Sequence, residues 1–353
     1  MDIKTLGIDI GKNKFHLHGV NQAGKIVFKK AMTRAKLYEF MANLKPCLVG
    51  MEACGGAHHL ARLFKERGHD VRLMAIQHVK PYVKAYKNDF NDAAGICEAV
   101  ARPHMHFVSI KTVAQQDILA LHNDRSRLVE ERTALANEMR GTLLEQGMTI
   151  PQGIHKIIPL VADLLDPECE DITSMLKRLL QRMSDDFKHK TLLIKECDDD
   201  LNALSKSNLQ VQQLMTIPGI GTITSTAIVG KVGDVTVFKN GRQLAAWIGL
   251  VPNQYTTGGK VQLGRISKRG DRYLRSLLVH GARSVLVALK RKREENLSSL
   301  LKWLKNVAER RGHNKGIVAF ANKMARMIWA LLANKTEYKE NYSRHSAQAK
   351  LPA

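Results

Sequence analysis

The sequence lacks the long apolar segment that a membrane span requires. No run of about 18 apolar residues occurs, and the first residues, MDIKTLGIDIG, contain an acid at position 2 and no long apolar core. We therefore expect neither a transmembrane helix nor a signal peptide. The five cysteines are scattered and form no CxxC pair. This usage predicts reduced thiols in the cytoplasm rather than disulfides or a zinc site.

Acidic residues are scarce relative to basic ones. The chain has 33 Asp and Glu against 55 Lys and Arg, which gives a formal net charge of +22. Such an excess indicates a polyanionic partner, most often nucleic acid, although a basic protein without such a partner would show the same composition. The 353 residues, 44% of them hydrophobic, suffice for two or three domains with cores.

Two carboxylates stand three residues apart in the stretch KNDFNDAA, residues 87–94. Asp89 and Asp92 would lie on one face of the first turn of a helix, which Asn91 or Asp89 is expected to cap. Acids are ordinary in a first turn. The pair alone therefore does not indicate a functional site, which also requires two further acids upstream.

Those two acids interrupt apolar segments. Asp9 lies within LGIDI, and Glu52 ends CLVGME. A carboxylate in a buried strand is costly unless a cation compensates it. A metal ion is the simplest such cation, and a buried salt bridge to a lysine is the alternative.

The first 90 residues alternate between strand and helix patterns. Strands are expected near 4–10, 15–20, 25–28, 46–52 and 71–76, with helices at 33–44 and at about 57–67. This order, with acids on the first strand, on a later strand and on a following helix, is the ribonuclease H-like pattern. Its chemistry uses two magnesium ions about 4 Å apart, which require carboxylates from separate elements. Candidate ligands are Asp9, Glu52, Asp89 and Asp92.

Two long helices are expected in the middle of the chain, at about 115–144 and 171–204. In the first, three leucines recur every seven residues: Leu121, Leu128 and Leu135. A coiled coil needs a second row of apolar residues in each heptad, and Arg125 and Arg132 occupy positions in that row. An antiparallel coiled-coil arm is predicted, and an ordinary helical bundle is the alternative.

The last third begins with TIPGIG, residues 216–221, which resembles the turn of a helix-hairpin-helix and would approach a phosphate. A helix at 238–248 closed by Gly249 follows, and then a flexible loop, 252–260, that carries two threonine hydroxyls. Further helices are expected at 272–291, 295–309 and 315–333. Six basic residues follow the hydroxyls and are candidates for binding phosphates, a solvated charged face being the alternative: Lys260, Arg265, Lys268, Arg269, Arg272 and Arg275.

Seven segments, in order and spacing, resemble the DEDD transposases of the insertion-sequence-110 family, also called bridge recombinases, and most closely the subgroup numbered 1111. They are GIDIGKNKFHLH, MEACGG, KNDFNDAAGICEA, IPGIG, GLVP, TTGGK and GRISKRGDRYLR. The resemblance covers nearly the whole chain. It implies a RuvC-like α/β domain at 1–112, a helical coiled-coil assembly region at 113–205, and a mostly α C-terminal transposase domain at 206–340.

The resemblance also implies the chemistry and the partners. Mg²⁺ would be held by Asp9, Glu52, Asp89 and Asp92. The partners would be the DNA of the element ends and the target, a structured noncoding guide RNA, and further copies of the chain in a dimer or tetramer. No membrane is implied, and the location would be the bacterial cytoplasm, in association with the nucleoid.

The family's nucleophile is a serine before glycine, and here the residue in register is Thr257. Thr256 is the second candidate and Ser267, in the basic stretch, the third. The methyl group of threonine would crowd in-line attack on phosphorus. Two other functions remain open: a nucleic-acid-binding scaffold with structural acids, and an actin-like kinase, because GIDIG also resembles a phosphate loop. The kinase would need a second glycine-rich motif late in the chain, which the sequence lacks.

Overall fold

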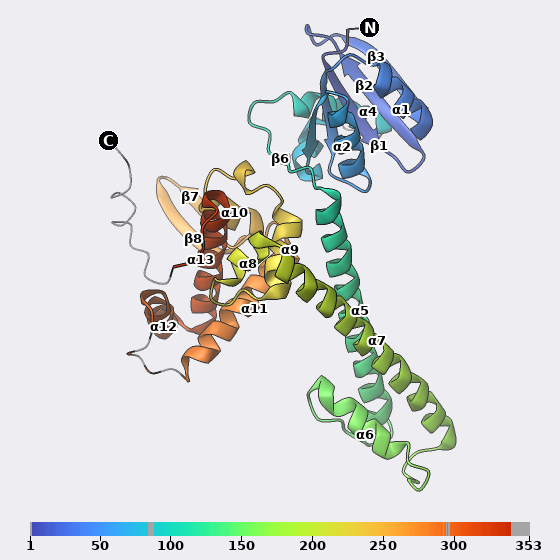
Figure 1. Ribbon diagram of the computed structural model, residues 1–353, viewed down its shortest axis with the longest axis vertical. Coiled ribbons are helices and arrows are strands. Elements are labelled where there is room, and N and C mark those ends of the chain that lie inside the picture. The colour runs from blue at the N-terminus through green and yellow to red at the C-terminus, as the bar shows by residue number, and fades with distance from the viewer. Residues whose placement is uncertain (1, 84–87, 292, 294, 296, 340–353) are drawn as a thin grey trace. The chain divides into compact units, whose positions relative to one another are not determined.

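The computed structural model describes residues 2–83, 88–291, 293, 295 and 297–339 (Figure 1). Lys87, at the start of the acidic stretch, lies outside this set. The chain divides into two compact units. One comprises Met1–Val113 with Val232–Val237, and the other comprises Ala114–Lys231 with Phe238–Ala353. The three domain ranges expected from the sequence stay a prediction.

The first unit is built on a six-stranded mixed sheet. Its order is β3-β2-β1-β4-β5-β6, with β1–β2 and β2–β3 antiparallel, β1–β4 and β4–β5 parallel, and β6 antiparallel to β5. The strands are β1 (Thr5–Ile10), β2 (Lys14–Val20), β3 (Ile26–Thr33), β4 (Leu48–Glu52), β5 (Asp70–Met74) and β6 (Phe107–Val108). The expected α/β domain with a mostly helical remainder is thus confirmed.

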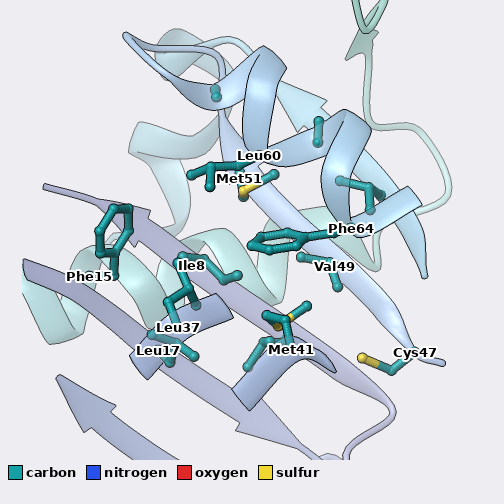
Figure 2. Packing of buried hydrophobic residues seen from close by; sticks show 14 of the residues in the cluster. Ile8, Phe15, Leu17, Leu37, Met41, Cys47, Val49, Met51, Leu60 and Phe64 are labelled. Carbon is teal, nitrogen blue, oxygen red and sulfur yellow. The ribbon is translucent and has the colours of Figure 1, made fainter. Parts of the chain in front are cut away.

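Alternation along the strands divides the side chains between the two faces of the sheet. Leu6, Ile8 and Leu17 point to the face covered by α1 (Arg34–Asn43) and α2 (Ala57–Glu66), where they join one buried cluster. Figure 2 shows this core, with the Phe64 ring of α2 among the strand side chains. Two short elements, α3 (Ile76–Val79) and η1 (Lys80–Tyr82), follow β5.

The opposite face carries α4 (Asp89–Val100), which approaches the sheet over two glycines. Gly7 of β1 and Gly50 of β4 are partners in the parallel register. A Cβ on Gly7 would lie 2.2 Å from the Ala93 carbonyl oxygen, and one on Gly50 would lie 2.7 Å from Val100 Cβ. Any larger residue at either position would force α4 away, so the glycines set how closely its first turn approaches β1.

In the second unit, α5 (Val113–Leu144) and α7 (Ser174–Ser207) pack antiparallel, joined through η2 (Ile154–Lys156) and α6 (Ile157–Leu164). Leu128 of the heptad is 2% exposed and packs with Ile194 and Cys197 of α7. Arg125, which lies in the second row of the heptad pattern, forms an ion pair with Asp198 of α7, with Nε 2.5 Å from Oδ1. The apolar stripe is therefore largely covered within one chain, and it gives no independent argument for assembly.

The C-terminal helices share a core around α13 (His313–Asn334), in which Phe320, Met324 and Ile328 are fully buried. By length and composition alone α13 could cross a membrane, but half of its most apolar window is buried inside the protein. It packs as a core helix against its neighbours. The other elements here are α8 (Leu209–Met215), α9 (Thr222–Val232), α10 (Gly241–Ile248), α11 (Arg272–Leu289) and α12 (Ser299–Arg311). The short η3 (Val235–Val237) belongs to the first unit.

The expected flexible loop at 252–260 is wrong. Residues 252–266 form an antiparallel hairpin of β7 (Pro252–Thr257) and β8 (Lys260–Ile266). Its two-residue turn, Gly258-Gly259, has φ values of 57° and 76°. Two successive positive φ angles match the twist of paired strands and favour glycine. The threonine hydroxyls therefore lie on an ordered ribbon.

Candidate active site

Strand alternation and the position of α4 bring the four predicted acids to one region of the first unit. Asp9 and Glu52 lie near the ends of β1 and β4, on the face that α4 covers. Asp89 and Asp92 occupy the first turn of α4. Three separate elements thus supply the carboxylates, as the predicted chemistry requires.

The start of α4 differs from the expectation in one detail. Neither Asn91 nor Asp89 caps the helix. Asn88 does, because its backbone is extended (φ −154°) and its side-chain oxygen accepts a hydrogen bond from Phe90 N at 2.9 Å. The asparagine side chain satisfies a free N–H of the first turn. Neither aspartate side chain is therefore needed as the cap.

Burial and repulsion between neighbouring acids raise two of the four pKa values. The pKa of Asp9 is raised above its usual value, first by burial and then by the charges of Asp92 and Asp89. Burial also raises the pKa of Glu52, to which Asp9 and Asp92 add. Carboxylates that repel each other in this way need a cation to remain ionised together.

The donor set suits a hard divalent ion, since carboxylate oxygens are the ligands that Mg²⁺ prefers. Across the described ranges, however, no group of three His, Cys, Asp or Glu side chains is close enough together to hold an ion. The Asp89 side chain is 62% exposed and so has room to move. An ion would have to draw the carboxylates together.

A histidine that sequence reasoning missed lies among the acids. His16 of β2 is the register partner of Asp9. Its Nδ1 lies 3.8 Å from Asp9 Oδ2 and 3.5 Å from Asp89 Oδ2. Alternation alone places residue 16 on the α4 face, but only the pairing register places it beside Asp9.

The candidate hydroxyls belong to the second unit. Thr256 and Thr257 are both exposed, and they point to opposite faces of the hairpin because neighbouring strand residues alternate. Thr257 pairs across the strands with Lys260, whereas Thr256 pairs with Val261. Ser267 lies outside the hairpin, where its N–H donates to the Val251 carbonyl at 2.8 Å.

The six candidate phosphate-binding residues divide into two kinds. Arg275 is half-buried, and its Nη1 donates to the Ile248 carbonyl at the end of α10 at 2.8 Å. The other five are exposed and form no ion pair with any described residue: Lys260, Arg265, Lys268, Arg269 and Arg272. Arg275 therefore has a structural contact, whereas the other five are available to a polyanion.

A mixed sheet with carboxylates from two strands and a helix is the arrangement expected of a DEDD enzyme that acts on nucleic acid. Residues 6–147 match the transposase family DEDD_Tnp_IS110, and residues 211–297 match the family described as Transposase IS116/IS110/IS902.

Relatives align along nearly the full length. The transposase for insertion sequence element IS1111A of Coxiella burnetii is 44% identical over 338 residues, covering 96% of this chain and 92% of that protein. A probable family 20 transposase of Pseudomonas aeruginosa is 42% identical, covering 96% and 99%. The transposase for element IS1328 of Yersinia enterocolitica is 41% identical, with the same coverage. This chain therefore belongs to the IS110 family of DEDD transposases, enzymes that cleave and transfer DNA strands.

Proposed function

We propose that the protein is an RNA-guided DNA recombinase that moves its own insertion sequence. The observation that carries the proposal is the convergence of Asp9, Glu52, Asp89 and Asp92 in one region of the first unit, where burial and then the neighbouring carboxylates raise the pKa values of Asp9 and Glu52. In a scaffold without a metal, this repulsion between the acids would only lower stability. In a metal site, the bound cation would offset it.

The four carboxylates would hold Mg²⁺. When bound, the ion would balance charge on the scissile phosphate and make a hydroxyl easier to deprotonate. Asp9 is 23% exposed and anchored on a strand, while Asp89 is largely exposed on the helix. The strand acids would therefore define the position of the site, and the first turn of α4 would adjust to the ion.

Thr257 is the proposed nucleophile. Its oxygen would form a bond to phosphorus as the bond from phosphorus to one deoxyribose oxygen breaks, and that oxygen would take up the proton from the threonine. The phosphodiester energy is kept in the protein–DNA bond, so a second DNA hydroxyl could reverse the step and join new strands. Lys260, the cross-strand partner of Thr257, supports this choice over Thr256, which pairs with Val261.

The basic residues around the hairpin would hold the nucleic acids. No acid occurs between Asp234 and Asp271, a segment that contains four of the five exposed cations. The DNA of the element ends and target and a structured guide RNA are the proposed partners. Assembly into a dimer or tetramer, the helix-hairpin-helix role of TIPGIG and a location at the bacterial nucleoid belong to the same proposal.

The deciding experiment is mass spectrometry of a trapped protein–DNA adduct. Thr257→Val keeps the side-chain volume but removes the hydroxyl, so cleavage should be lost while RNA binding is retained. Thr257→Ser should keep or increase activity because the crowding methyl group is gone. Thr256→Val, one residue away on the other face, is the matched control and should cleave.

An adduct on Thr256 or Ser267 would contradict the choice of Thr257. Strand exchange without any adduct would refute the covalent mechanism. Magnesium-independent nucleic-acid binding with no cleavage at all would instead favour the scaffold.

A further inference from the structure

His16 Nδ1 is a buried polar atom without a hydrogen-bond partner among the described residues. Such atoms are rare in folded proteins because burial removes them from water without replacing the lost hydrogen bond. Here the unpaired atom faces two carboxylate oxygens, 3.8 Å away on Asp9 and 3.5 Å away on Asp89. Both distances are too long for a hydrogen bond.

We propose that His16 is a nitrogen ligand of the divalent ion, alongside the four carboxylates. This inference rests on the metal site of the proposed function. Two donors that share an ion through bonds of about 2.1 Å lie roughly 3–4 Å apart. The two distances from Nδ1 fall within that range, but among the described residues no three such groups are yet gathered closely enough to hold an ion. A small movement of the exposed Asp89 side chain would bring its oxygen to an ion shared with His16 Nδ1 and Asp9.

The imidazole ring is held from two sides. The antiparallel register places His16 directly opposite Asp9. From α4, the ring of Phe90 meets the His16 ring edge to face, with centroids 4.8 Å apart and planes at 78°. Phe90 directly follows Asp89, so the same helical turn orients the ring and carries the carboxylate.

A nitrogen donor changes which ion the site prefers. Mg²⁺ favours oxygen ligands, whereas imidazole suits first-row transition metals. The site should therefore bind Mn²⁺ more tightly than Mg²⁺, and His16 should be the residue responsible for that selectivity.

The test uses full-length protein loaded with Mn²⁺ and electron spin-echo envelope modulation, which detects a nitrogen bound to the ion. The wild-type spectrum should show ¹⁴N modulation from imidazole. His16→Gln should lose it and bind Mn²⁺ about tenfold or more weakly, with a smaller loss for Mg²⁺. His59→Gln, which changes an exposed histidine of α2 in the same unit, should keep both the modulation and the affinity.

The wild-type spectrum decides the matter even if His16→Gln fails to fold. Mn²⁺ binding that Asp89→Asn abolishes, without ¹⁴N modulation in the wild type, would overturn the role of His16 and leave the acidic site intact. If folded His16→Gln still shows ¹⁴N modulation, His16 is not the nitrogen ligand, although the acidic site would stand. If the wild type binds no Mn²⁺, both His16 as a ligand and the proposed metal site are wrong.

Discussion

Gly7→Ala should separate the acids by moving the helix that carries two of them. The new Cβ would lie 2.2 Å from Ala93 O, 2.5 Å from Cys97 N and 2.8 Å from Cys97 Cβ. Ordinary contacts are about 3.5 Å or longer, so α4 must retreat by roughly 1 Å. Overpacking of this kind costs about 1–3 kcal/mol, and the upper end is expected because two of the three obstructing atoms belong to the backbone.

The same retreat would draw Asp89 and Asp92 away from Asp9. A misplacement of about 1 Å can reduce a reaction rate by about 100-fold, so strand cleavage should fall by that order. Hydrogen exchange followed by mass spectrometry would report stability in the β1 and α4 peptides specifically, because the two units of the chain need not unfold together.

Gly55→Ala is the matched control in the same unit. A Cβ there has no atom within 4 Å and the backbone needs no positive φ, so this change should be neutral or slightly stabilising. If Gly7→Ala exchanges no faster than Gly55→Ala in those peptides, the close approach of α4 does not position the acids as argued.

Two further predictions concern charge. Because burial and neighbouring acids raise the folded-state pKa values of Asp9 and Glu52, the metal-free protein should lose stability as pH rises above their ordinary values of 3.8 and 4.5. Asp92→Asn should flatten that loss in thermal denaturation scans and raise the melting temperature at neutral pH; a lower melting temperature with unchanged pH dependence would contradict it. In the C-terminal region, Arg265→Ala with Lys268→Ala should reduce the slope of log affinity against log salt by about one unit per lost contact. Arg275→Ala should instead lower stability, because its guanidinium donates a hydrogen bond to the Ile248 carbonyl. A reduced salt slope for Arg275→Ala, with an unchanged slope for the double variant, would contradict both assignments.

Local patterns in the sequence predicted much of the first unit. Period-two alternation located β1, β2 and β4, and it showed that Asp9 interrupts an apolar run. The turn residues of the hairpin were also visible, since Gly258-Gly259 is a favoured two-residue turn between strands. The sequence nevertheless favours a loop there, because polar residues dominate β7 and glycines lie at the centre of the stretch. The apolar side chains of the hairpin, Tyr255, Val261 and Leu263, are exposed, so no buried face marks the strands.

Tertiary structure decided what depends on contacts between distant residues. The register between β1 and β2 places His16 beside Asp9, and a shift of one residue would turn it to the other face. Gly7 and Gly50 are ordinary strand glycines until α4 packs over them. Pairing with α7 likewise covers the leucine stripe of α5. Burial energy is gained only when such segments meet, so one-dimensional periodicity identifies the faces of each element but not the partners that cover them.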